Sequence, residues 1–399
     1  MKYHSAPTFC FRFALLLSFA VVGPSPSPLA GKTNEQLTTS TKPRVVAPGI
    51  SYWVTTEQST SGPVVFHVVN MDMSRPDFSL YAQPGAGRLF SGQAPDKVHE
   101  RLRQGGKDVL VSVNGDFWSG SPTGRMFKPI GLHVTDGILA TTSTTRSTLI
   151  VDDAGKASIA TVQLSMEARI GQETLPISDL NNTDTTCGLV IFTGPFNKPL
   201  EAMTTRPLAV VQLFEFGPRA NSKVSGTVAN VLTTGSATPT SRTILLAFNE
   251  DVMERFPKTA VEVSVESELT GHSGSVAQAV GGGPRIVHRG RPSAKADGIV
   301  EKVARSFVPA RHPRSAVALS RDKKKMWWVV VDGRQPGYSV GINLTDLGRF
   351  LRKLGAWEAI NLDGGGSSCL VVDGQVVNSP SDKGRTVRPV CNTLHLIRK

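Results

Sequence analysis

The chain has 399 residues and a formal net charge of +12, and hydrophobic residues make up 39% of it. This length suits one large domain or two ordinary ones, and the hydrophobic content is ordinary for a globular protein. The positive charge favours anionic glycans, phosphates or membrane surfaces as partners, whereas the scattering of the basic residues argues against nucleic acid, the runner-up partner.

Residues 1–30 resemble a secretory signal peptide. Lys2 and Arg12 make the N-terminal part basic, and an apolar core covers residues 13–22. The segment that ends at Ala30 has the small residues expected of a cleavage site. The core is too short to cross a bilayer, and no cysteine directly follows it that could carry a lipid anchor. Its removal takes away two basic residues and no acidic ones, so the net charge falls from +12 to +10. We therefore expect a secreted or periplasmic protein with no transmembrane segment in the mature chain.

The rest of the chain is expected to be a linker followed by one domain. Residues 31–48 are polar and rich in Thr and Pro, which is typical of a flexible linker. Residues 49–399 are expected to form a single domain in which strand signals dominate, and the middle, roughly 150–270, is expected to be sheet scaffold. A short helix is expected at 96–104, and early strands are expected at 64–69, 78–81 and 109–113.

The last hundred residues carry the clearest pattern. Residues 326–331 are expected to form a strand that ends at Asp332 and Gly333, and residues 357–362 one that ends at Asp363 and Gly364. Between them, residues 345–354 have apolar side chains at helical spacing, with Thr345 placed to cap the start and Gly355 the end. Such a crossover makes the two strands parallel, so both Asp-Gly pairs should lie at one sheet edge, where ligands bind.

These signals together predict a mixed α/β or α+β fold. We expect a strand-rich mixed sheet with a few helices, including one βαβ crossover near the C-terminus. A third strand, 109–113, also ends in polar residues, at Asn114, Gly115 and Asp116.

Three cysteines follow residue 30, namely Cys187, Cys369 and Cys391. Cys369 and Cys391 lie in two C-terminal strand-like runs and could pair in an oxidising compartment, but spacing alone does not establish a bridge. The sequence has no CxxC motif and no zinc-like spacing of Cys and His.

The stretch NLDGGGSSC, residues 361–369, does not fit two familiar templates. A Walker loop needs a lysine before its final Ser or Thr, and a nucleophile elbow needs a glycine where Cys369 stands. It remains either a glycine-rich corner capped by Asp363 or an anion cradle made of backbone N–H groups. Arg314 and Arg285 are candidate phosphate ligands, since arginine suits bidentate phosphate contacts.

At this point the chain resembles the phosphodiester glycosidase family. The resemblance is carried by GINL at 341–344 and AINLDGGGSS at 359–368, with further matches at VNGDFW 113–118, GGGP 281–284, PRSA 313–316, VDGR 331–334, NSPSD 378–382 and RPVCN 388–392. The elements occur in the family's order over roughly residues 110–392. The resemblance implies that residues 49–399 form a catalytic domain with hydrolase activity toward glycosyl phosphodiesters, for example GlcNAc-1-phosphodiesters of a glycoconjugate or envelope polysaccharide.

The resemblance and the residue chemistry together suggest a site. The expected catalytic residues are Asp363, Asp332, Asp116 and Asn114, and the expected substrate-binding residues are Arg314, Arg285, Gly364, Gly365, Gly366 and Ser367. No cofactor is required, but a divalent cation bridging Asp116, Asp332 and Asp363 would suit three carboxylates. Asp116, Ser315 and Cys369 depart from residues common in the family.

Two other functions remain open from the sequence. The first is metal-dependent phosphodiester cleavage at phosphorus. The second is a non-catalytic module that binds cell-envelope glycan. Oligomeric state and the stereochemical outcome are not indicated by the sequence.

Overall fold

The computed structural model describes residues 38–119, 127–142 and 145–399, so the expected signal peptide lies outside the described residues. Part of the expected linker is instead strand. β1 (Thr38–Ser40) and β2 (Arg44–Ala47) pair antiparallel with β3 (Ile50–Ser59). The β-branched Val45 and Val46 favour this conformation, and Ala47 is buried in the core at 4% exposure. The flexible-linker prediction is therefore wrong for the described strands of this stretch.

The largest sheet around the site is antiparallel throughout. Its order is β1, β3, β4 (Gly62–Asp72), β25 (Lys325–Val331), β24 (Arg314–Leu319), β26 (Glu358–Asn361), β22 (Arg285–His288) and β23 (Arg291–Pro292), with β2 beside β3. β24 lies between β25 and β26 and pairs antiparallel with both. Those two strands therefore run in the same direction without touching, and their carboxyl ends face the same edge.

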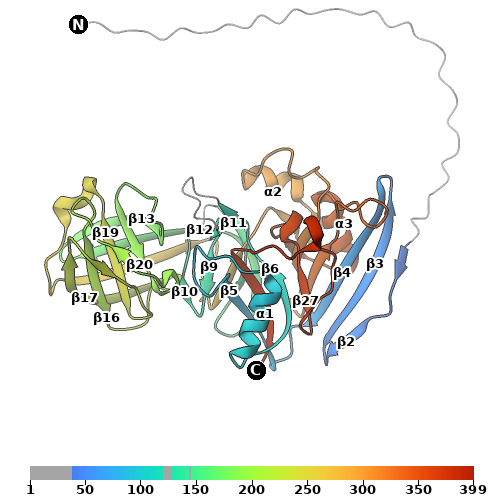
Figure 1. Ribbon diagram of the computed structural model, residues 1–399, viewed down its shortest axis with the longest axis horizontal. Helices are drawn as coiled ribbons and strands as arrows, with labels where there is room; N and C mark the ends of the chain where they lie inside the picture. Colours follow the sequence, from blue (N-terminus) through green and yellow to red (C-terminus); the bar gives the residue numbers. More distant parts are fainter. Residues whose placement is uncertain (1–37, 120–126, 143–144) are drawn as a thin grey trace, which may run out of the picture. The chain divides into compact units, whose positions relative to one another are not determined.

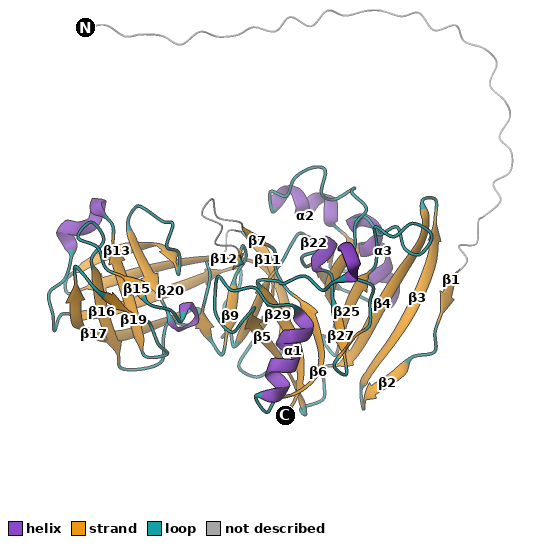
Figure 2. Cartoon of the chain, in the orientation of Figure 1, coloured by secondary structure: helices purple, strands orange, loops and turns teal. Residues whose placement is uncertain are grey.

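Helix α3 (Leu344–Leu354) connects β25 to β26, and with α2 (Ala294–Val300) it packs on β22 (Figures 1 and 2). Its N-cap is Asn343, whose side-chain oxygen accepts the Asp346 amide at 2.9 Å, so the prediction of Thr345 as the cap is wrong. An amide oxygen one position outside the first turn reaches the N3 amide, which Thr345, already inside the helix, does not. Gly355 ends the helix in the left-handed conformation, as predicted.

A second sheet completes the core beneath the site. Its order is β28 (Gln375–Val376), β27 (Leu370–Val372), β6 (Asp108–Asn114), β29 (Asn392–Arg398) and β5 (Phe78–Pro84), and α1 (Pro95–Gln104) packs on β6. One hydrophobic cluster joins Val317, Trp328 and Ile360 of the first sheet to Val111 and Leu394 of the second. The two sheets thus bury their facing sides against each other.

The middle of the chain forms a separate strand scaffold, as predicted (Figure 1). β12 (Ala157–Ile170), β13 (Glu173–Leu180), β14 (Leu189–Phe192), β19 (Thr243–Phe248), β16 (Leu208–Leu213), β17 (Ser222–Leu232) and β20 (Glu262–Thr270) pair in that order. Pairing of β20 with β12 closes them into a barrel. β11 (Arg146–Val151), β21 (Gln278–Gly281), β9 (His133–Thr135) and β10 (Ile138–Leu139) extend the sheet from β12.

Two small pairs and four 3₁₀ turns complete the described elements. β7 (Trp118–Ser119) pairs with β8 (Lys128–Pro129), and β15 (Leu200–Glu201) pairs with β18 (Ser236–Ala237). The 3₁₀ turns are at Gly194–Phe196, Glu250–Arg255, Gly365–Ser367 and Lys383–Arg385. The strand-rich α+β character of the prediction is confirmed.

Within the described residues, no helix has the length and apolar character needed to cross a bilayer. Cys369 and Cys391 are buried and not joined to each other, so the bridge considered from the sequence is absent between them. The Cys391 thiol instead contacts the Asp116 carbonyl oxygen at 3.3 Å.

Candidate active site

A cleft of about 300 Å³ opens where β26 ends. It is lined by the cationic side chains Arg314, Arg334 and Arg388, by Asp363, and by Phe117, Phe307, His312, Gly364, Gly365 and Gly366. We call it the Asp363 cleft, because Asp363 is the only carboxylate among the described residues that line it. One acid among three guanidiniums makes this a basic cleft suited to an anion.

The loop after β26 holds Asp363 through backbone contacts. Its amide donates to the Gly115 carbonyl at 2.9 Å, and its carbonyl accepts the Asn114 side-chain amide at 2.7 Å. The carboxylate Oδ1 accepts the Gly364 amide at 2.8 Å. Burial raises the pKa of Asp363 to about 6, although Ser367, the Gly364 amide and nearby arginines favour its charged form.

Asn114 is fully buried and braces this loop from β6. Its side-chain oxygen accepts the Ser315 hydroxyl at 2.7 Å and the Cys369 amide at 3.1 Å, while its amide holds the Asp363 carbonyl. All of these partners are protein groups, and Asn114 does not line the cleft. Its position is that of a positioning residue.

Gly364 and Gly365, which follow Asp363, let neighbouring protein groups approach the backbone of this loop closely. A Cβ on Gly364 would lie 2.7 Å from the Pro313 carbonyl oxygen, and one on Gly365, whose φ is +62°, would lie 3.0 Å from an Arg334 nitrogen. The Gly364 amide is bonded to Asp363, and the Gly365 amide donates to the Pro313 carbonyl at 2.9 Å. The idea of a cradle of free N–H groups is therefore wrong for these two glycines. Ser367 is buried, with 1% exposed, and does not line the cleft.

The three arginines of the cleft are held differently. Arg314 is 1% exposed, and its Nη2 donates to the Phe307 and Ala310 carbonyls, each at 2.9 Å. Burial lowers the pKa of Arg314 to about 10, so it stays charged at neutral pH. Arg388 forms a two-point pair with Asp382, at 2.8 and 2.9 Å.

Arg334 is the exposed member of the three. It has a φ of +60°, and its Nη2 lies 3.3 Å from Nδ1 of His312. Burial, together with the charges of Arg314 and Arg334, lowers the pKa of His312 below its usual value. A neutral imidazole can accept a hydrogen bond from Arg334 and so orient the guanidinium.

Asp332 does not line the Asp363 cleft. Its carboxylate is fully buried and accepts the Tyr338 hydroxyl and the His67 Nε2 nitrogen, each at 2.9 Å. It also accepts the Ser379 amide at 2.9 Å and the Asn378 side-chain amide at 3.2 Å. The bonds to Asn378 and Ser379 tie the end of β25 to the loop that follows β28. Asp332 lies two residues before Arg334, so this network also fixes the backbone that leads to Arg334.

Asp116 is also fully buried and lies outside the lining of the cleft. Its two carboxylate oxygens accept the Phe117 amide at 2.7 Å and the Gly131 amide at 2.5 Å. Burial raises the pKa of Asp116 to about 7, against the opposing effects of Arg146 and these amides. Asp116 therefore fixes the segment that places Phe117 against Phe307, whose rings meet edge to face at 5.7 Å.

Arg285 is not brought to the cleft. It lies on β22, where its guanidinium approaches Glu358 at 3.5 Å and the Thr161 hydroxyl at 3.4 Å. Nor do the predicted metal ligands come together, because no group of three or more His, Cys, Asp or Glu side chains able to hold an ion is found in the described ranges.

Five cleft residues were not singled out from the sequence, namely Arg334, Arg388, His312, Phe117 and Phe307. Four of them lie within or beside matched motifs: Arg334 ends VDGR, Arg388 begins RPVCN, His312 precedes PRSA, and Phe117 is in VNGDFW. The motifs therefore held a sequence signal that could have identified these four residues as part of the site. Phe307 lies outside every motif, so the sequence held no such signal for it.

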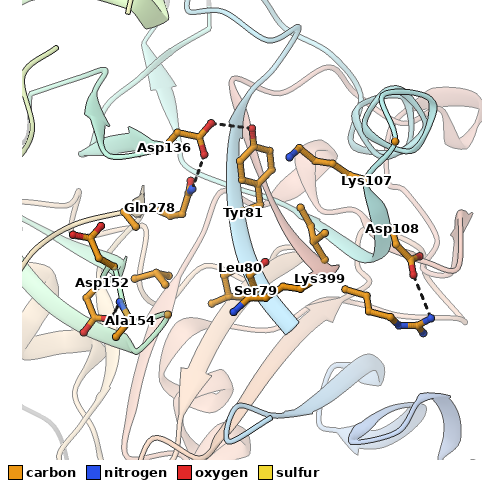
Figure 3. Close-up of a pocket in the computed structure, with 17 residues that line it drawn as sticks. Ser79, Leu80, Tyr81, Lys107, Asp108, Asp136, Asp152, Ala154, Gln278 and Lys399 are labelled. Carbon is orange, nitrogen blue, oxygen red and sulfur yellow. Dashed lines mark hydrogen bonds and ion pairs between the residues drawn. The ribbon is translucent and has the colours of Figure 1, made fainter. Parts of the chain in front are cut away.

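A larger cavity of about 630 Å³ contains none of the predicted site residues (Figure 3). Asp136 in its wall accepts the Tyr81 hydroxyl and the Gln278 side-chain amide, each at 3.2 Å. Asp108 there pairs with Arg398 at 3.2 Å. These polar groups satisfy one another, so size alone does not make this cavity the reactive site.

Comparison with solved structures places the fold among known ones. A hypothetical protein from Synechocystis superposes with a TM-score of 0.69 at 19% identity, covering 88% of this chain and 62% of that one. A Burkholderia pseudomallei protein described only as a candidate exported protein gives 0.70 at 18% identity, covering 91% and 97%. The zebrafish N-acetylglucosamine-1-phosphodiester alpha-N-acetylglucosaminidase catalytic domain, auto-inhibited by its pro-peptide, gives 0.50 at 15% identity, covering 91% and 88%.

Sequence comparison adds the family. The bovine N-acetylglucosamine-1-phosphodiester alpha-N-acetylglucosaminidase is 41% identical over 76 residues, which is 19% of this chain and only 14% of that relative. Residues 219–396 match the phosphodiester glycosidase family, a range that contains Asp363, Arg314, Arg334 and Arg388. The resemblance drawn from the motifs is thus confirmed over residues 219–396, which match the phosphodiester glycosidase family.

Proposed function

We propose that the chain is an exported hydrolase that cleaves the glycosyl–phosphate bond of a sugar-1-phosphodiester, such as a GlcNAc-1-phosphodiester in a glycoconjugate or envelope polysaccharide. The observation that carries the proposal is the Asp363 cleft, where one carboxylate shares a basic pocket with Arg314, Arg334 and Arg388. A phosphodiester is an anion, and guanidinium groups match its oxygens in shape and charge. The family match over residues 219–396 supports this class of reaction.

In the proposed reaction, water replaces phosphate at the sugar C1 atom. The C1–O bond breaks and its electron pair leaves with the phosphate oxygen, while a water oxygen bonds to C1 and loses a proton to the released phosphate or to solvent. The products are the free sugar and a phosphomonoester. Because this leaving group is already a stable anion, it needs little protonation, so the enzyme mainly stabilises positive charge on the sugar ring and holds the phosphate.

We assign these two tasks to different sides of the cleft. The ionised Asp363 carboxylate stabilises the developing charge at C1, either by electrostatics or by a transient bond. Arg334, the exposed arginine, contacts the phosphate, and Arg314 and Arg388 add positive charge around it. The ring pair of Phe117 and Phe307 gives the sugar an apolar wall.

Asn114, Asp116 and Asp332 are assigned to positioning. The acceptor oxygens of each are bonded to protein groups, and none of the three lines the cleft. Arg285 is left out of the proposed site, because its guanidinium lies by Glu358.

Export is part of the proposal and rests on two observations. The first is the pattern of basic, apolar and small residues in 1–30. The second is the description given to the Burkholderia relative. Secretion of the full-length chain with loss of its first 30 or so residues, read by N-terminal sequencing, would test this point.

The test of activity is product identification. Purified protein is incubated with a GlcNAc-1-phosphodiester, and the products are separated by mass and by ³¹P NMR. Free GlcNAc and a phosphomonoester are expected. Release of GlcNAc-1-phosphate would instead show cleavage at phosphorus, and tight binding without products would indicate a glycan-binding module; either result overturns the proposal.

A further inference from the structure

The most basic run of the sequence, residues 321–325, lies at the end of the first sheet that is remote from the Asp363 cleft. β24 begins at Arg314, which lines the cleft, and ends at Leu319 shortly before the run. β25 starts at Lys325 and returns to Val331. A strand rises about 3.3 Å per residue, so five steps along β24 separate the two places by about 16 Å. The run therefore belongs to a different surface.

The fold uses the only acidic residue of this run to hold the turn. Oδ1 of Asp322 accepts the Ser320 hydroxyl at 2.6 Å and the Lys324 amide at 3.1 Å. The Ser320 oxygen in turn accepts the Lys325 amide at 2.9 Å, and Lys323 takes a φ of +60°. The hairpin is thus fixed in shape, while the side chains of its three lysines are exposed.

The end of α3 enlarges this basic surface. Arg352 and Lys353 occupy its last turn and are exposed, although Lys353 approaches Glu57 at 3.3 Å. A shallow groove of about 660 Å³ joins the hairpin to the helix end, and it is lined by Ser320, Arg321, Asp322, Lys325, Trp327, Leu354 and Gly355. We define the hairpin patch as Arg321, Lys323, Lys324, Lys325, Arg352 and Lys353.

The surroundings of the patch discriminate between polyanions. Trp327 is 4% exposed and the Arg321 guanidinium covers the Trp357 ring at 4.8 Å, so neither ring offers the stacking platform that single-stranded nucleic acid needs. The exposed large apolar side chains of the described residues are elsewhere, for example Phe214 and Ile299. The patch therefore lacks the apolar groups that anchor a protein in a bilayer interface.

We propose that the hairpin patch is a docking surface for a linear anionic polysaccharide, independent of the chemistry at Asp363. Arg321 and Lys325 line the groove, and the other four cations of the patch are exposed on the hairpin and the helix end beside it. Such a set of ammonium and guanidinium groups can contact successive sulfate or phosphate groups of one chain. Such contacts are screened by salt, so binding is expected to weaken steeply as ionic strength rises.

The probe is fluorescein-labelled dextran sulfate, with binding to the full chain measured by anisotropy over a range of salt concentrations. The double variant Lys323→Glu/Lys325→Glu is expected to bind about tenfold more weakly or worse at low salt, since two contacts become repulsive. The control is Lys156→Glu/Lys258→Glu, which changes the net charge equally at two other exposed lysines. It should stay within about twofold of the original chain.

Three results would overturn the proposal. They are no binding of dextran sulfate by the unchanged chain, equal weakening in both double variants, and stronger binding to phosphatidylglycerol vesicles or to a single-stranded oligonucleotide of matched charge. Cleavage of a small GlcNAc-1-phosphodiester should be the same in the hairpin variant and the unchanged chain. The docking surface and the proposed reaction therefore succeed or fail separately.

Discussion

Two strands of the first sheet, β25 and β26, are each followed by an Asp-Gly dipeptide at the same edge of the sheet, yet the two carboxylates lie in opposite environments. Asp332 is fully buried and accepts hydrogen bonds from His67, Tyr338, Asn378 and Ser379. Asp363 lines a cleft and has a pKa raised to about 6. The difference teaches that the protein donors around a carboxylate, rather than its place in a motif, decide whether it remains available to a ligand.

The largest expected effect separates the two residues by activity. Asp363→Asn should lower kcat by about 10³-fold or more, because the neutral amide cannot stabilise positive charge at C1. Oδ1 of the new side chain can still accept the Gly364 amide, so the thermal unfolding midpoint should not fall. The measurement is release of free GlcNAc, and a variant retaining more than a tenth of the activity would remove Asp363 from the proposed chemistry.

The next effect is on stability and belongs to the other carboxylate. Asp332→Ala leaves several buried donors without their acceptor and should cost about 3–5 kcal/mol of unfolding free energy. Urea unfolding of the full chain measures it. Asn114→Ala removes the buried side chain that holds the Asp363 loop, and the same urea measurement allows the two positioning residues to be compared. If Asp332→Ala unfolded at the same urea concentration as the unchanged chain, its network would not be structural.

Much of this contrast could not be predicted from the sequence. Hydrophobic spacing located β25, α3 and β26 within a residue or two. The motifs identified Asp363 and Arg314, and both residues line one cleft. However, the sequence does not show whether the side chain of a residue that follows a strand points toward solvent or toward the core. Asp332 turns inward because His67 and Tyr338, 265 and 6 residues away in the chain, supply donors there. His67 is far from Asp332 in the chain and leaves no local signal, and the residue type of Tyr338 does not show which way its hydroxyl points.

The other corrections have separate causes, some local and some long-range. Asn343 caps α3 because the chain turns one residue earlier than the apolar pattern indicates. Arg285 follows a motif glycine turn, but its strand pairs with β26 and brings its guanidinium to Glu358 instead of the cleft. Arg334 was overlooked because its left-handed backbone, which places it over Gly365, is not visible in residue type.

A smaller effect sharpens the division of labour within the cleft. Arg334→Ala should raise KM for the phosphodiester by about 10- to 150-fold with a smaller change in kcat, since a charge-assisted contact to phosphate contributes about 1.5–3 kcal/mol. Initial-rate kinetics with the same substrate provide the measurement. Arg285→Ala is the matched control and should change KM by less than about twofold, because a partner on another strand occupies it. Equal effects of the two variants would contradict the assignment of Arg334.

The smallest effect concerns the pH dependence of stability that Asp363 contributes. Burial raises the pKa of Asp363 from 3.8 to about 6, so the folded state holds a proton that the unfolded state has already released. Its contribution to stability is fully present below pH 3.8 and is lost as the pH rises through about 6. Asp363→Asn removes that loss and should make the chain about 1–2 kcal/mol more stable at neutral pH, with little difference near pH 4, after allowance for its partial exposure. Urea unfolding at both pH values tests this. A variant less stable than the unchanged chain at neutral pH would mean that the charged Asp363 is held by favourable contacts, as Asp332 is, and that a cleft carboxylate poised for chemistry is the wrong description.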